Sequence, residues 1–185
     1  MKKLCLFAAV LLILTGCKNQ ESYIQRGMDI RDRVTQKRCA FTACITADYG
    51  QSSYTFVMEC RSGDSGDLSF VVKVPEAISD ISGRLTADSG FLTFDDVALA
   101  FPLLADGEIS PVSAPWIFLN TLRNGYLVAA GEDGVLYRLT LRDSYEDDAL
   151  HVDVWIDEDN IPQRAEILWQ GRSVLSLHIE EFVFV

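Results

Sequence analysis

The sequence is poor in the side chains that most often carry out chemistry. Its 185 residues include only two histidines, His151 and His178, and both alternate with apolar residues in runs typical of strands. A Ser–His or Cys–His hydrolytic site needs a histidine beside a nucleophile. The sequence also has no Gly-x-Ser-x-Gly, phosphate-loop or dinucleotide-binding motif. We therefore expect a protein that is not an enzyme and that uses no cofactor.

Metal ligands are scarce as well. No Cys-x-x-Cys pair is present, which disfavours a zinc site. The acidic stretches at 146–148 and 157–160 are candidates for calcium, but the second lacks the spacing and the terminal glutamate of an EF-hand loop. Acidic turns are commonly just solvated, and we predict no metal site.

Basic residues are outnumbered, with 16 Lys and Arg against 27 Asp and Glu and a net charge of −11 at pH 7. Such a surface disfavours nucleic acid as a partner, because phosphates need basic side chains. It also disfavours broad electrostatic binding to anionic lipids. High acidity by itself indicates only a well-solvated surface.

The N-terminus has the order of a bacterial lipoprotein signal. Lys2 and Lys3 precede an uncharged apolar run that has the length of a signal-peptide core and is too short to span a bilayer. Leu14-Thr15-Gly16-Cys17 follows and resembles a lipobox, the site of cleavage and lipidation. We expect residues 1–16 to be removed as a signal peptide and Cys17 to carry the lipid. An ordinary secretory leader with a chance cysteine is the alternative.

Loss of the leader with its two lysines would change the net charge from −11 to −13. The acyl chains, rather than surface charge, would then hold the protein on the extracytoplasmic face of a bacterial membrane. Residues 18–22 are polar, and residues 17–22 are expected to form a lipidated tether. Residues 23–185 suit a single domain with a sizeable core.

The tether is followed by one amphipathic helix, predicted over roughly 21–36. Apolar residues recur there with helical spacing, at Tyr23, Gly27, Ile30 and Val34, with Ile24 and Met28 beside them. Beyond Lys37 the apolar period changes to two. We interpret as strands the runs at 41–46, 54–58, 68–74, 85–87, 91–94, 97–101, 126–130, 135–141, 150–156, 165–169 and 174–184. Tight turns between them predict an antiparallel meander, either an open barrel or a strongly curved sheet, in the α+β class.

One short, very apolar helix interrupts this meander. Ser113 is a suitable cap, Pro115 suits the first helical turn and Gly125 suits the stop. Apolar side chains wrap most of the helix, although only one face of a helix can meet a sheet directly. The helix is therefore either deeply buried or lines a cavity.

The hairpin predicted near Tyr49-Gly50 suggests a disulfide. If these two residues form the loop, Phe41 faces Met58 and Cys39 faces Cys60. Cross-strand neighbours lie at about the separation that a disulfide needs, and an oxidising compartment allows the bond. We predict a Cys39–Cys60 disulfide, with two small buried thiols as the alternative.

The order of elements resembles the LolA/LolB-like superfamily of lipoprotein carriers. The matching features are Ser110-Pro111, the strand with Ala165-Glu166-Ile167 after Pro162, and the last strand around residues 179–182. Among relatives, the chain looks most like the small anchored lipoproteins of spore-forming bacteria, including the germination lipoprotein called GerS. The resemblance implies a half-barrel of antiparallel strands with helices over its concave, apolar face.

Two functions follow from this resemblance. Carriers of this superfamily hold acyl chains on the concave face, so the first expectation is an anchored protein that binds a lipid or a lipoprotein acyl chain. The germination lipoprotein binds a partner enzyme instead, so the alternative is a module that binds or regulates a cell-envelope protein. In both cases we predict that the short helix covers the concave face and that its apolar residues meet the ligand or partner. These residues are Trp116, Phe118, Leu119 and Leu122.

Overall fold

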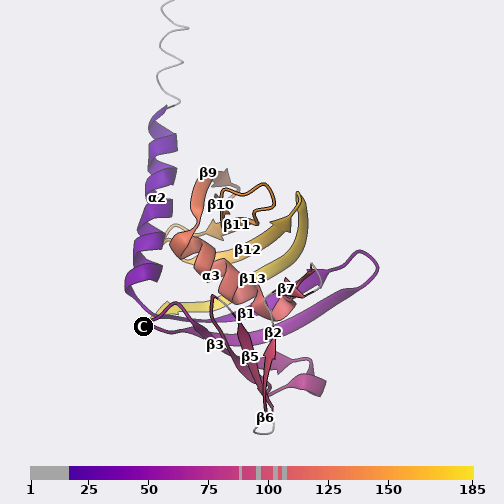
Figure 1. Ribbon diagram of the computed structural model, residues 1–185. Coiled ribbons are helices and arrows are strands. Elements are labelled where there is room, and N and C mark those ends of the chain that lie inside the picture. Colours follow the sequence, from indigo (N-terminus) through magenta and orange to yellow (C-terminus); the bar gives the residue numbers. More distant parts are fainter. Residues whose placement is uncertain (1–16, 88, 95–96, 102–103, 106–107) are drawn as a thin grey trace, which may run out of the picture.

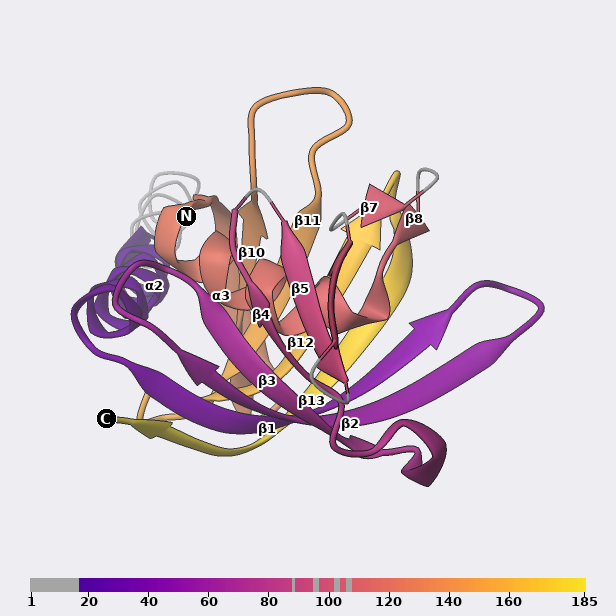
Figure 2. The same cartoon turned by 60° about the horizontal axis from the view of Figure 1, so that its bottom comes forward.

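The computed structural model describes residues 17–87, 89–94, 97–101, 104–105 and 108–185. Among these residues, an antiparallel sheet of 11 strands curves around a short helix without closing into a barrel (Figure 1, Figure 2). The predicted α+β class, half-barrel sheet and two helices are confirmed. The elements are α2 (Cys17–Gln36), β1 (Cys39–Asp48), β2 (Ser53–Ser62), β3 (Leu68–Val74), the 3-10 helix η1 (Glu76–Ile78), β4 (Ser82–Leu85), β5 (Gly90–Phe94), β6 (Val97–Phe101), β7 (Leu104–Ala105), β8 (Glu108–Ile109), the 3-10 helix η2 (Pro111–Ser113), α3 (Ala114–Asn124), β9 (Tyr126–Asp133), β10 (Leu136–Arg142), β11 (His151–Ile156), β12 (Pro162–Trp169) and β13 (Arg172–Phe184).

The strand order explains why a helix interrupts the meander. The sheet runs β6-β5-β4-β3-β2-β1-β13-β12-β11-β10-β9, so the first and last strands of the chain pair at its centre. The middle of the chain supplies both edges, β6 and β9. A flat sheet of this size would be roughly 48 Å wide at about 4.8 Å per strand. The connection between the two edges therefore has to cross the sheet, and α3 lies on that crossing.

Alternation along the strands directs one set of side chains to the concave face. In β1, residues 39, 41, 43, 45 and 47 are buried, and those between them are half-exposed. β13 and β12 pair beside β1 and contribute buried residues such as Leu177 and Ile167 to the same face. α3 fills the trough that these strands form, so sheet and helix share one hydrophobic core.

Helix α2 is longer than predicted. It begins at Cys17, so residues 17–22, which we expected to form a tether, are helical. No Pro or Gly lies between Cys17 and Tyr23, so nothing in this stretch interrupts the helix. Figure 1 shows its N-terminal turns extending beyond the sheet. Leu14 to Gly16 and the rest of the leader lie outside the described residues. No described helix is both long enough and apolar enough to cross a membrane.

The predicted register of the β1–β2 hairpin is wrong. Asp48 pairs with Ser53, so residues 49–52 form a four-residue loop, and Cys60 faces Phe41. The longer loop arises because Tyr49 does not end the turn: its N–H donates to the carbonyl of Ser52, 3.1 Å away. Every cross-strand partner on β2 therefore moves by two residues.

The corrected register separates the two cysteines that we expected to be bonded. The Cys39 N–H donates to the Ser62 hydroxyl (2.8 Å), while Cys60 lies diagonally across the pair on the same buried face. Diagonal neighbours in a sheet are about 7–8 Å apart, beyond the usual Cα separation of a disulfide. Both side chains are free thiols in the structure. The register from which we predicted a Cys39–Cys60 disulfide is therefore not the observed one.

Candidate functional site

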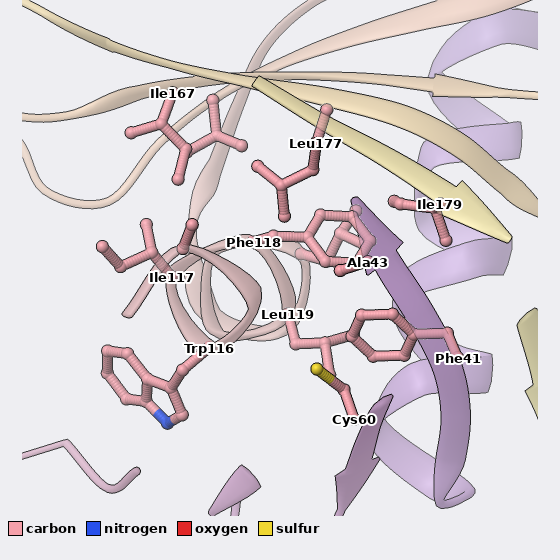
Figure 3. Packing of buried hydrophobic residues seen from close by; sticks show 14 of the residues in the cluster. Phe41, Ala43, Cys60, Trp116, Ile117, Phe118, Leu119, Ile167, Leu177 and Ile179 are labelled. Carbon is pink, nitrogen blue, oxygen red and sulfur yellow. The ribbon is translucent and has the colours of Figure 1, made fainter. Parts of the chain in front are cut away.

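The predicted binding residues of α3 lie in the core. Phe118 is fully buried, Leu119 and Leu122 are each 1% exposed, and Trp116 is 8% exposed. Figure 3 shows Phe118 pointing toward Leu177 and Phe41, and the Phe118 and Phe41 rings meet edge to face with centroids 6.0 Å apart. The structure therefore confirms that α3 covers the concave face, and the surroundings of these residues are filled with side chains.

Local interactions fix the start of α3. Pro115 lies in the first helical turn, as predicted. Ser113 holds the N-cap position, as predicted, but its hydroxyl donates to the carbonyl of Ser110 (2.6 Å) and makes no capping hydrogen bond to the helix. Trp116 Nε1 donates to the carbonyl of Gly66 in the β2–β3 loop (3.1 Å), so the one polar atom of this large side chain is satisfied.

Two arginines join the C-terminal ends of α2 and α3. Arg31 of α2 donates to the carbonyls of Leu122 (3.1 Å) and Gly125 at the end of α3. Arg123 of α3 donates in return to the carbonyl of Val34 in the last turn of α2 (2.8 Å). The last carbonyls of a helix have no partner within it and carry partial negative charge, so each guanidinium satisfies acceptors of the other helix. This exchange holds the two helices side by side across the concave face.

The acidic turn between β11 and β12 is organised by its own hydrogen bonds. Asp157 Oδ1 accepts the N–H groups of Asp159 and Ile161, both at 2.9 Å. The carbonyl of Asp159 accepts from Arg33 of α2 (2.7 Å). Asn160 Oδ1 accepts in the same way from Arg26 of α2. This turn therefore anchors α2. The oxygens of Asp157, Asp159 and Asn160 accept hydrogen bonds from within the turn and from α2.

The histidines and cysteines are not assembled into a reactive group. His178 is exposed beside Glu180, with 3.7 Å between Nε2 and Oε1, and His151 is half-buried opposite Arg142. Burial raises the pKa of the Cys60 thiol well above its usual range. Burial also raises the pKa of Cys39. A thiol is unreactive when it stays protonated, so these cysteines behave as small buried hydrophobes. The described residues contain no group of three His, Cys, Asp or Glu side chains placed to hold a metal ion.

Among the surface hollows of the described residues, two have several apolar side chains in their lining. One, of about 280 Å³, opens between the β1–β2 and β12–β13 hairpins and is lined by Tyr49, Ile109 and Trp169 among others. The other, of about 340 Å³, lies between α2 and the edge strand β9. We call this second hollow the α2–β9 groove. Its exposed apolar lining residues are Ile24, Met28, Tyr126, Val128 and Tyr145.

The groove residues were not among the binding residues predicted from the sequence. Ile24 and Met28 lie beside the buried stripe of the helix and make its apolar face wider than the part that packs in the core. That extra width could have indicated an exposed apolar site. Ile24 and Met28 remain 43% and 39% exposed. Tyr145, in an acidic loop, was a second signal and is 73% exposed. These residues lie near Val128 only because β9 is an edge strand of the sheet. The sequence does not show which strand lies at the edge.

Comparison with solved structures finds proteins whose backbone fold is similar to that of this chain. No protein-family model and no curated protein matches the sequence. A putative outer membrane lipoprotein-sorting protein domain from Vibrio parahaemolyticus is similar, with a TM-score of 0.48, 11% identity, and coverage of 89% of this chain and 92% of that one. A LolA superfamily protein from Nitrosomonas europaea has a TM-score of 0.45 at 11% identity, covering 84% and 92%. The lipoprotein LppX from Mycobacterium tuberculosis has a TM-score of 0.41 at 14% identity, covering 87% and 93%. At these values the likenesses assign neither a ligand nor a partner to this chain.

Proposed function

We propose that this protein is an extracytoplasmic lipoprotein without catalytic activity, anchored through Cys17, that binds another protein of the cell envelope. The observation that carries the proposal is the filled concave face. A carrier of acyl chains needs an open apolar cavity, whereas Phe118, Leu119 and Leu122 are packed to 1% exposure or less. A protein-binding module needs a stable, filled interior and exposed apolar surface elsewhere. The α2–β9 groove offers such a surface.

The continuity of α2 supports the anchored part of this proposal. The helix runs from Cys17 into the arginine-mediated joint with α3, so a lipid on Cys17 would be connected to the domain by a regular element. At about 1.5 Å per residue, Ile24 and Met28 lie roughly 10–17 Å along the helix axis from Cys17. The domain would therefore be held close to the membrane and in a restricted orientation, which suits capture of an envelope partner. The resemblance to the germination lipoprotein GerS, which suggests a cell-wall enzyme as partner, remains a prediction.

Binding of a small apolar ligand is the second candidate, and the hollow beside Tyr49, Ile109 and Trp169 favours it. Its volume of about 280 Å³ lies just below the range of roughly 300–1,000 Å³ that is usual for ligand pockets. A ligand there would occupy the rim of the half-barrel and leave the packed core around α3 intact. A lipid with two acyl chains would need considerably more room.

Purification of the lipidated protein from bacterial membranes tests the proposal. Native mass spectrometry should give the mass of the lipid-modified chain without a second bound lipid. In-cell cross-linking should give protein adducts that depend on the anchor and are reduced in Cys17→Ser. A lipid that co-purifies at one per chain, together with an absence of protein adducts, would establish the carrier function instead.

A further inference from the structure

The α2–β9 groove combines a helix face with an open sheet edge. Ile24 and Met28, one helical turn apart, form its helical wall. Tyr126 and Val128 of β9 form the opposite wall, and Tyr145 closes one end by packing its ring against that of Tyr126, with centroids 3.8 Å apart. All five side chains are between 39% and 73% exposed. A contiguous exposed patch of this kind marks an interaction site more often than scattered single apolar residues do.

Strand β9 faces the groove with an unpaired edge. Within the described part of the chain it is the last strand of the sheet and pairs only with β10, so one row of its backbone N–H and C=O groups has no described strand partner. Val128 lies at a bulge, because Leu127 pairs with Leu141 and Ala129 pairs with Thr140. Bulges turn the edge locally and re-aim side chains. From residue 126 to residue 131 the strand has no Lys, Arg or Pro. The features that limit pairing at this edge are the bulge and the neighbouring α2, whose Tyr23 donates to Glu132 near the end of β9 (2.8 Å).

The charges around the groove favour a basic occupant. Asp32 follows Met28 by one turn on the exposed side of α2, and Glu146, Asp147 and Asp148 follow Tyr145. No described side chain pairs with the carboxylates of these three loop residues. Arg31 also lines the groove, but its guanidinium is bound to the carbonyls at the end of α3. Free carboxylates therefore lie on the segments next to the groove, and the nearby guanidiniums are already engaged. Besides Arg31, Arg142 pairs with Tyr126 across the β9–β10 ladder and donates to the carbonyl of Glu146 (2.6 Å).

We propose that the α2–β9 groove binds an extended segment of a partner protein, rich in alternating basic and apolar residues, which adds to the edge of β9 as a twelfth strand. This inference rests on the proposed function and specifies its site. Main-chain hydrogen bonds to β9 supply affinity in such strand addition, and pockets for alternate side chains supply specificity. The apolar side chains enter between Met28 and Val128, and the basic ones reach the carboxylates next to the groove. Six residues of β9, 126 to 131, span about 20 Å in extended form, which accommodates a segment of six to eight residues.

Three capped eight-residue peptides test this mode of binding on the full-length lipidated protein in detergent. The first alternates Lys with Val, the second replaces every Lys with Glu, and the third is the Lys–Val peptide with alternate backbone nitrogens methylated. The first should bind, and more weakly as salt is raised. The other two should bind at least tenfold more weakly. Bound peptide should slow hydrogen exchange of the amides between Leu127 and Gly131. No binding of the Lys–Val peptide at millimolar concentration, or equal binding of the methylated one, overturns the proposal.

Variants of the groove locate the site. Val128→Lys places a positive charge on its strand wall and should weaken Lys–Val peptide binding at least tenfold. Val135→Lys is the matched control, because Val135 is 90% exposed in the β9–β10 turn and does not line the groove. Met28→Lys places a positive charge on the helical wall of the groove and should weaken peptide binding in the same way. Thermal unfolding shows whether each variant folds, so Met28→Lys replaces Val128→Lys if the latter does not. Equal affinity of all three variants and the wild type overturns the assignment.

Three further outcomes separate this inference from its alternatives. If a lipid bilayer alone, without peptide, slows exchange of the β9 amides in nanodiscs, the groove faces the membrane and the proposal fails. If in-cell protein adducts persist unchanged in both Val128→Lys and Met28→Lys, the protein-binding function stands and the groove is not its site. If no adduct forms in the wild type, the proposed function itself fails.

Discussion

Substitution of Phe118 by alanine distinguishes a packed core from a working cavity. The side chain is fully buried and its ring meets that of Phe41 edge to face. Removing a buried phenylalanine ring typically costs about 3–5 kcal/mol of unfolding free energy, since transfer energy is lost and a cavity remains. In a domain of this size each kcal/mol lowers the melting temperature by roughly 2–4 °C. We therefore expect the melting temperature of Phe118→Ala to fall by roughly 6–20 °C.

Urea unfolding followed by tryptophan fluorescence measures this change directly. Phe91→Ala is the matched control: Phe91 is 45% exposed on β5, and its truncation should cost less than about 1 kcal/mol. The wild type should bind no solvatochromic lipid probe, whereas the cavity in Phe118→Ala should admit a small apolar molecule such as benzene. A cost below about 1 kcal/mol for Phe118→Ala, or saturable binding of the lipid probe to the wild type at the concave face, would refute the conclusion that the concave face is filled.

Three further predictions follow from single residues. A fatty-acid probe should label the protein in cells and should not label Cys17→Ser; equal labelling of both would exclude the anchor. Intact mass after blocking free thiols should show Cys39 and Cys60 both modified under denaturing, non-reducing conditions, and a mass lower by two hydrogens that reduction restores would instead reveal a disulfide between them. The Ser65 hydroxyl (2.6 Å) and the Arg84 guanidinium (2.9 Å) lower the pKa of Asp67, so its ionised form stabilises the fold above the unfolded pKa of about 3.9. Asp67→Asn should therefore be less stable than the wild type at pH 7, and urea unfolding across pH should show this difference disappear as pH falls through the lowered pKa.

The sequence by itself determined the elements and the class of fold. Period-two runs separated by turn residues predicted most of the strands because half-buried antiparallel strands need that alternation. Pro115 and Gly125 marked the two ends of the short helix, which runs from Ala114 to Asn124, since local backbone chemistry governs both ends. The wrap of apolar residues around this helix left deep burial and the lining of a cavity as alternatives, and the side chains are observed to be buried.

Only the tertiary structure decided which residues meet across the fold. The register of the β1–β2 hairpin depended on a loop of four residues rather than two, and the alternation of apolar residues is satisfied by both registers because they differ by two positions. The reciprocal arginine hydrogen bonds between the ends of α2 and α3 join residues about 90 positions apart, and no local sequence pattern predicts them.

The position of β9 at the edge of the sheet was likewise decided in three dimensions. Chain order predicts that consecutive strands pair, which accounts for β1 to β6 and for β9 to β13. It does not say that β1 pairs with β13 and thereby leaves β6 and β9 as opposite edges. That long-range pairing exposes one side of β9 to the groove beside α2. The α3 residues that the sequence predicted as a binding site lie in the packed core of the protein. The candidate site lies instead at the β9 edge of the sheet.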